Sequence, residues 1–125
     1  MSDKKHVLLV EDNLVAMKVA QMMLSMAGCE VDLAKDGPEA VTMATKNHYD
    51  GICMDIGLPT LSGVEACKAI RQYEIEHHVA PTPIIAVTGN NSPEEAREYL
   101  QAGMQSVIEK PLTKEKTLRF LSYCH

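Results

Sequence analysis

The chain has 125 residues with 46% hydrophobic and 23% charged side chains, a composition typical of one ordinary globular domain over residues 1–125. A net charge of −5 and the lack of a basic stripe argue against direct binding to nucleic acid. No apolar run approaches the roughly 18 residues that cross a bilayer, so we expect a cytoplasmic domain without membrane contact. Four scattered cysteines without a CxxC pair indicate reduced thiols.

The N-terminal half of the chain alternates between strand and helix patterns. Residues 6–10 form a short apolar run typical of a buried strand, and from 13 to 27 apolar residues recur at helical spacing. Residues 29–34 alternate as a second strand, and a helix with proline in its first turn is expected from 36 to about 47. Residues 50–55 are a third, strongly apolar strand that ends on a carboxylate. Burying such a group is costly unless cations or hydrogen bonds compensate it.

The C-terminal half continues the alternation. A helix is expected from 63 to 76, followed by a polar connection marked by prolines and a fourth strand over 84–88. Ser-Pro-Glu-Glu is a strong start for a helix over 92–103. A short fifth strand covers 106–109, and a last helix begins after residue 113. Five strand–helix repeats predict a parallel sheet covered by helices on both faces, the doubly wound α/β class.

Polar residues follow the predicted strands at the points where the strands end. Glu11 and Asp12 follow the first strand, Asp55 ends the third, Thr88 ends the fourth and Lys110 follows the fifth. Because parallel strands bring their carboxyl ends to one edge of the sheet, we expect these side chains to converge there. Three clustered carboxylates repel one another, so a hard cation such as Mg²⁺, or Mn²⁺ in its place, is expected among them.

This set of side chains has the parts needed for phosphoryl transfer. A cation, an ammonium and a hydroxyl together neutralise or hydrogen-bond the phosphoryl oxygens, and one carboxylate can act as the nucleophile that forms an acyl phosphate. Asp55 is the natural nucleophile, because the loop that would respond begins beside it. Each residue alone could instead be a helix cap or a solvated strand end, as Asp12 could be for the helix that follows it.

Four stretches of the sequence resemble the signature blocks of the response-regulator receiver domain. They are LLVEDN (8–13), MDIGLPTLSG (54–63), PIIAVTGN (83–90) and EKP (109–111). They follow one another in the family's order and cover essentially the whole chain. The resemblance implies a flavodoxin-like (βα)5 fold whose five parallel strands lie in the order 2-1-3-4-5.

The resemblance also implies roles for the residues that bind metal and phosphate. Asp55 matches the phospho-accepting aspartate, Asp12 the direct Mg²⁺ ligand and Glu11 its water-mediated companion. The backbone carbonyl of Gly57 matches the remaining protein ligand of the metal. Gly57 and Asn90 also match variable positions that influence how water reaches the acyl phosphate.

Other matched positions concern the response to phosphorylation. Thr88 and Lys110 match the residues that bind the phosphoryl oxygens and relay its presence. Pro111 matches a proline that follows a cis peptide bond. Val107 departs from the family, which usually has an aromatic switch residue there, so the usual coupling of threonine to an inward-turning ring is in doubt.

The first predicted helix is apolar nearly all round, which is typical of a buried helix or a docking surface. The stripe expected to face the core consists of Ala16, Val19, Ala20, Met23, Leu24 and Ala27. Further apolar residues lie on its other faces, namely Leu14, Val15, Met17, Met22 and Met26. Since the matching helix of receivers docks histidine-containing donors, we interpret four of these residues as a docking face, namely Leu14, Val15, Met17 and Met22. The expected partners are a histidine kinase or a histidine-phosphotransfer protein, and the oligomeric state stays open.

Other functions explain the residues less well. A haloacid-dehalogenase-like phosphatase needs a second aspartate where Gly57 stands. A flavin phosphate would be repelled by Glu11 and Asp12, and no GxxxxGK[ST] loop for nucleotide hydrolysis is present. A receiver used as a phosphorylation-independent interaction module remains an alternative. We expect a domain that catalyses its own phosphorylation without being a turnover enzyme, either free-standing or part of a longer protein such as a hybrid kinase.

Overall fold

The computed structural model describes residues 4–89 and 92–125, and within them five strands and five helices alternate along the chain. The strands are β1 (His6–Val10), β2 (Glu30–Ala34), β3 (Gly51–Asp55), β4 (Ile84–Thr88) and β5 (Ser106–Glu109). The helices are α1 (Leu14–Met26), α2 (Gly37–Lys46), α3 (Gly63–Glu76), α4 (Pro93–Gln101) and α5 (Lys114–Tyr123). All pairings are parallel and the order is β2-β1-β3-β4-β5, which confirms the expected fold class.

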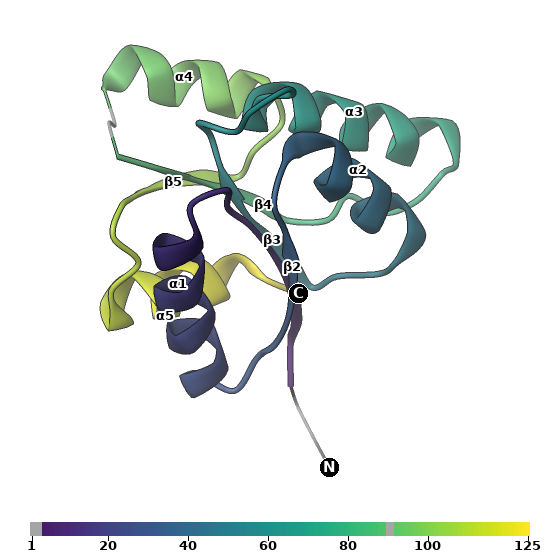
Figure 1. The fold of residues 1–125 in the computed structure, drawn as a ribbon. Helices are drawn as coiled ribbons and strands as arrows, with labels where there is room; N and C mark the ends of the chain where they lie inside the picture. Colours follow the sequence, from purple (N-terminus) through teal and green to yellow (C-terminus); the bar gives the residue numbers. More distant parts are fainter. Residues whose placement is uncertain (1–3, 90–91) are drawn as a thin grey trace.

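The sheet is the middle of three layers. Figure 1 shows α1 and α5 on one face of the sheet and α2, α3 and α4 on the other. No helix among the described residues is both long and apolar enough to traverse a lipid bilayer. Because helices cover both faces, the central strands β3 and β4 are buried along their whole length.

Two hydrophobic clusters, one on each face of the sheet, form the core. In β1, Leu8 and Val10 belong to the cluster that packs under α2, α3 and α4. Val7 and Leu9 point to the opposite face and belong to the cluster under α1 and α5. Successive strand residues therefore alternate between two cores, and each fully buried aliphatic side chain contributes about 1.5–3 kcal/mol through removal from water.

A short polar side chain caps the start of each of the five described helices. In α1 the cap is Asn13, whose Oδ1 accepts a hydrogen bond from the Ala16 amide at 2.9 Å. Asp12 is therefore not the cap, and its carboxylate stays at the edge of the sheet. Gly28 ends the turn after α1 with φ of +92°, a conformation that favours glycine, and this places the start of β2 at Glu30.

The face of α1 that packs on the sheet differs from the expected stripe. The buried residues are Met17, Ala20 and Leu24, whereas Val19 is 44% exposed. Met17, with 7% of its surface exposed, is a core residue, and its assignment to the docking face is wrong. In a helix that is apolar nearly all round, the pattern does not select one face, and packing against the sheet makes the choice.

The close approach of α3 to the end of β3 depends on Gly63. A Cβ at Gly63 would lie 2.4 Å from the backbone oxygen of Asp55 and 3.0 Å from the Cα of Ile56. We therefore expect Gly63→Ala to lower the free energy of unfolding by about 1–3 kcal/mol in a urea titration, because backbone must move. The matched control is Gly57→Ala, whose Cβ would meet nothing within 4 Å, and it should change stability by less than about 0.5 kcal/mol. Equal losses in both variants would contradict this reading of the contact.

Candidate functional site

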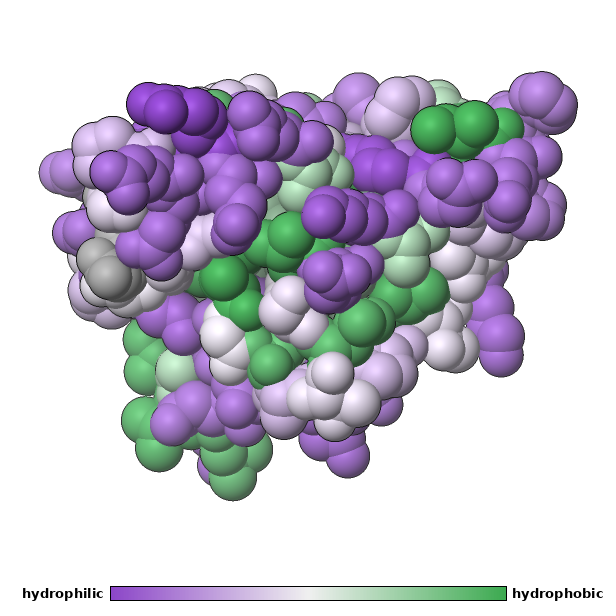
Figure 2. Space-filling view, turned by 90° about the horizontal axis from the view of Figure 1, so that it is seen from above, coloured by the Kyte–Doolittle hydropathy of each residue, from purple (hydrophilic) through white to green (hydrophobic). Residues whose placement is uncertain are grey.

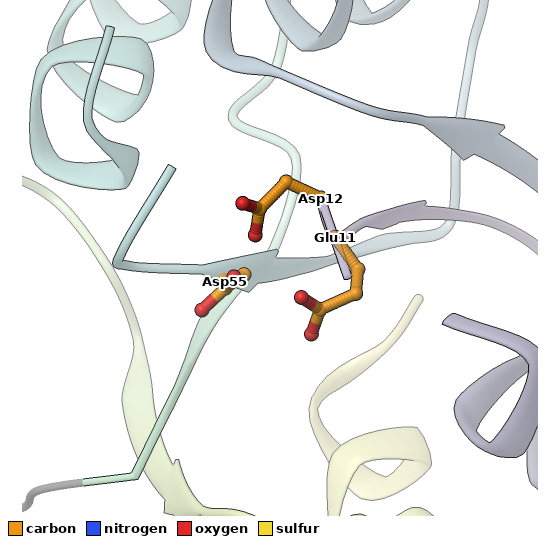
Figure 3. Close-up of side chains that lie close together, drawn as sticks. All are labelled: Glu11, Asp12 and Asp55. Carbon is orange, nitrogen blue, oxygen red and sulfur yellow. The ribbon is translucent and has the colours of Figure 1, made fainter. Parts of the chain in front are cut away.

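Three carboxylates from two neighbouring strands meet at the carboxyl edge of the sheet. Val10 at the end of β1 pairs with Met54 in β3, so Glu11 and Asp12 come to lie beside Asp55. Figure 3 shows the three side chains directed into the same space. One oxygen of each carboxylate lies within 4.8 Å of the others. The expected convergence of the strand ends is therefore present.

Lys110 compensates two of these carboxylates. Its Nζ lies 3.0 Å from Oε1 of Glu11 and 3.2 Å from Oδ1 of Asp55. Glu11 and Asp55 are 5% and 6% exposed, whereas Asp12 is exposed. Backbone amides assist, since Asn13 donates to Glu11 at 3.1 Å and Gly57 donates to Asp55 at 3.3 Å. Three carboxylates against one ammonium still leave an excess of two negative charges.

The electrostatics shift two pKa values in this cluster. Burial raises the pKa of Glu11, and the nearby Asp55 carboxylate adds to this, while the Asn13 amide and Lys110 oppose it. Burial alone would lower the pKa of Lys110, but its pairs with Glu11 and Asp55 outweigh burial and raise it. Lys110 is therefore held as a cation, and the charged form of Glu11 is the disfavoured one.

The backbone of Lys110 is tied to the end of β4. The Lys110 amide donates to the carbonyl of Thr88 at 2.7 Å, which extends the β4–β5 pairing by one residue. The peptide bond between Lys110 and Pro111 is cis, as the resemblance implied. Thr88 is buried at the end of β4 and lines one solvent-open cleft together with Asp55 and Lys110.

The acidic residues fit a divalent metal ion. Within residues 4–89 and 92–125, Glu11, Asp12 and Asp55 are the one group of acidic, histidine or cysteine side chains placed to share an ion. Carboxylate oxygens and an excess of two negative charges suit Mg²⁺, which keeps several waters in its shell. Gly57 lines the same cleft, as the expected carbonyl ligand must. Asn90 lies outside the described residues.

Two residues of the cleft were not expected from the sequence. Glu95 and Tyr99 of α4 line it together with Asp55 and Lys110. Tyr99 is 3% exposed, and its hydroxyl donates to Oε2 of Glu95 at 3.3 Å. Their spacing of four residues places both on one face of a helix, but no motif links them to the strand ends. Val107 stands where the family usually has an aromatic residue. It pairs with Ala86 across the β4–β5 ladder and packs, partly buried, against the core.

The exposed part of α1 forms an apolar surface next to the cleft. Leu14, Val15 and Met22 are 65%, 73% and 60% exposed, and Met26 is 77% exposed. Figure 2 shows apolar side chains gathered where α1 lies, at the lower left of the view. Beside the helix, a largely apolar cavity of about 180 Å³ reaches from Val19 to the segment that follows Lys110. Three of the four proposed docking residues are thus exposed.

Comparison with known proteins gives one consistent family. The family model described as the response regulator receiver domain matches residues 7–121. The transcription factor SKN7 of Candida albicans is 39% identical over 95% of this chain, and the chain spans only 20% of that protein. The chain therefore corresponds to a small part of such curated relatives.

Two solved structures are similar over nearly the whole chain. The receiver domain of Ssk1 from Saccharomyces cerevisiae, co-crystallised with the histidine phosphotransfer protein Ypd1, has a TM-score of 0.91 and 31% identity, covering 99% of this chain and 91% of that one. The receiver domain of the sensor histidine kinase PA1611 from Pseudomonas aeruginosa holds a magnesium ion in its active-site cleft. It has a TM-score of 0.83 and 39% identity, covering 95% of each chain.

Removal of the Lys110 charge should lower the stability of the domain, because the clustered carboxylates then lack their cation. We expect Lys110→Met to lower the free energy of unfolding by about 1–3 kcal/mol at pH 7, because Glu11 and Asp55 stay buried without their cation. The pKa of Glu11 is already raised, so its protonation begins at a higher pH than usual and removes the need for a cation. The deficit should therefore shrink between pH 7 and pH 5 in urea titrations. Lys68→Met, at an exposed position of α3, is the charge-matched control. A deficit that is the same at both pH values would count against this account.

Proposed function

The chain belongs to the response regulator receiver family of two-component signalling, and from this premise we propose that Asp55 is the residue that accepts the phosphoryl group. The observation that carries the proposal is the position of its carboxylate. Asp55 is buried at the end of β3, 3.2 Å from the Lys110 ammonium and within 4.8 Å of two further carboxylates. The carboxylate is thus fixed beside groups that can hold a phosphoryl group.

The proposed reaction is an in-line transfer from a phosphohistidine. An oxygen of Asp55 forms a bond to phosphorus while the P–N bond to the donor imidazole breaks, and the electron pair of that bond returns to the ring nitrogen. The product is an acyl phosphate. The Lys110 ammonium and the Thr88 hydroxyl, which line the same cleft as Asp55, bind the phosphoryl oxygens whose charge they neutralise or satisfy.

We propose that Glu11, Asp12, Asp55 and the Gly57 carbonyl hold Mg²⁺, or Mn²⁺ in its place. The bound ion supplies neutralisation of the charge that carboxylate and phosphoryl oxygens share. The magnesium ion in the cleft of the PA1611 receiver supports this assignment. Without the ion, the excess negative charge of the cluster would repel an incoming phosphoryl group.

The proposed partner is a histidine-phosphotransfer protein or a histidine kinase, which docks on Leu14, Val15 and Met22 of α1. Exposed apolar surface beside the reactive carboxylate supports this face, as does the complex of the similar Ssk1 receiver with Ypd1. We further propose that residues 1–125 form one receiver unit and act in the cytosol, where its unpaired cysteines stay reduced.

A phosphorylation-independent interaction module is the competing function. Such a module would need the fold and the α1 surface but not the charged cluster. In the structure, Lys110 pairs with the buried carboxylates of Glu11 and Asp55, whose burial costs stability, and Asp12 lies beside them. Their presence favours the phospho-accepting function, and the following experiment separates the two.

Phosphorylation of Asp55 is tested directly with acetyl phosphate. In the presence of Mg²⁺ we expect intact-mass measurement to show one added phosphoryl group on the wild type and none on Asp55→Asn. Removal of the metal with EDTA should also abolish the adduct. Asp36→Asn, which replaces one helix cap by another, is the matched control and should be phosphorylated normally. An unmodified wild type under these conditions would favour the interaction module.

The docking face is tested by comparing two phosphoryl donors. We expect Val15→Glu to slow transfer from phosphorylated Ypd1 by about tenfold or more, because a charge replaces apolar contact surface. Phosphorylation by acetyl phosphate, which needs no protein contact, should be unchanged. Ile75→Glu in α3 is the control, since Ile75 is 70% exposed but lies on the opposite side of the sheet. Unimpaired transfer from Ypd1 to the Val15 variant would exclude this face.

A further inference from the structure

The apolar cavity beside α1 lies on the face of the sheet that α1 and α5 cover (Figure 1). Leu9, Cys53 and Val87 of β1, β3 and β4 line it and belong to the hydrophobic cluster of that face. Because successive strand residues point to opposite faces, the residues two positions further on, Glu11 and Asp55, belong to the same face. The cavity therefore reaches the charged cluster from the side of α1.

The walls of the cavity are uncharged over most of their length. Ala20 of α1 and Leu112 of the segment before α5 are buried and complete the apolar lining. Burial raises the pKa of the Cys53 thiol to about 12, so this group is neutral at pH 7 and acts as a small apolar side chain. Because a buried charge loses its hydration, these walls favour an uncharged occupant.

The cavity has an opening and the volume of a small ring system. Val19 of α1 is 44% exposed and Pro111 is exposed, so a molecule can enter between the helix and the segment that follows Lys110. The volume is about 180 Å³, whereas an apolar cavity of about 150 Å³ already holds a benzene molecule. A ligand of one or two fused rings therefore fits, and a drug-sized molecule does not.

Charged side chains close the inner end of the cavity. Glu11, Asp55 and Lys110 line both this cavity and the solvent-open cleft. Oε1 of Glu11 pairs with Lys110, and Oε2 accepts from the Asn13 amide. A carboxylate oxygen has a second lone pair, and an ionised carboxylate accepts without donating. This end of the cavity therefore favours a ligand with a hydrogen-bond donor, and the excess of negative charge disfavours an anion.

We propose that this cavity is a binding site for a small, neutral aromatic molecule that carries one N–H or O–H donor. The ring packs against Ala20, Val87 and Leu112, and the donor bonds to the carboxylate of Glu11. The inference does not depend on the proposed phosphorylation. The groove between α1 and α5 beside Met26 is also largely apolar, but no carboxylate is among the described residues that line it. A donor on the ligand thus favours the cavity over the groove.

Indole, an aromatic molecule with one N–H donor, is the probe that tests the site. In an NMR titration of the labelled protein at pH 8 without Mg²⁺, we expect saturable amide shifts at Ala16, Val19 and Leu112 with a Kd of about 0.1–1 mM. Indene has nearly the same shape without the N–H. It should bind about tenfold more weakly, the factor that a hydrogen bond to a charged group contributes.

Two variants make the result specific to the cavity. Ala20→Leu places extra side-chain atoms in the cavity and should abolish the indole-induced shifts, while the spectrum itself shows that the variant is folded. Ala80→Leu, at an exposed position between α3 and β4, is the matched control and should bind indole as the wild type does.

Three results would overturn the inference. They are equal affinities for indole and indene, shifts confined to Met26 and Leu118 of the groove, and unimpaired binding by Ala20→Leu. The comparison of the two ligands needs only the wild type, so it decides the question even where Ala20→Leu does not fold.

Discussion

The compensation of clustered carboxylates by Lys110 is the interaction on which this structure depends. A parallel sheet brings its strand ends to one edge, and here that edge carries Glu11, Asp12 and Asp55. The fold keeps two of them buried with the Lys110 ammonium paired to both, from a backbone position held by Thr88, and with one backbone amide donating to each. The excess of negative charge at this edge destabilises the fold, and for the same reason it favours the binding of a divalent cation. The charged groups that determine the stability of this edge are thus the same groups that can bind a cation.

The sequence alone predicts the elements and the residues of the charged cluster, because both depend on local pattern. Apolar runs, helical spacing and cap residues define strands and helices to within one or two residues. The residues at the carboxyl ends of the strands identify the site, because a parallel sheet brings these ends to one edge. The pattern fails where packing decides. In α1, apolar on all sides, the buried face is centred on Met17 and Ala20, so Met17 is a core residue and not a docking one.

Tyr99 and Glu95 were beyond sequence reasoning for a different reason. They lie on a helix that follows the fourth strand and approach the cleft only through the way α4 packs. A capping serine followed three and seven residues later by glutamate and tyrosine is compatible with many surface helices. Val107 indicated that a ring was missing from β5, but nothing in the pattern placed Tyr99 of α4 at the cleft.

The three-layer arrangement separates the apolar surface of α1 from the helix α4 that lines the cleft of Asp55. The α1 surface lies on one side of the sheet and α4 on the other, and only the edge between them is shared. A protein seated on α1 therefore leaves α4 open to solvent. Under the proposed function, a second protein can therefore reach α4 while a phosphoryl donor is docked on α1.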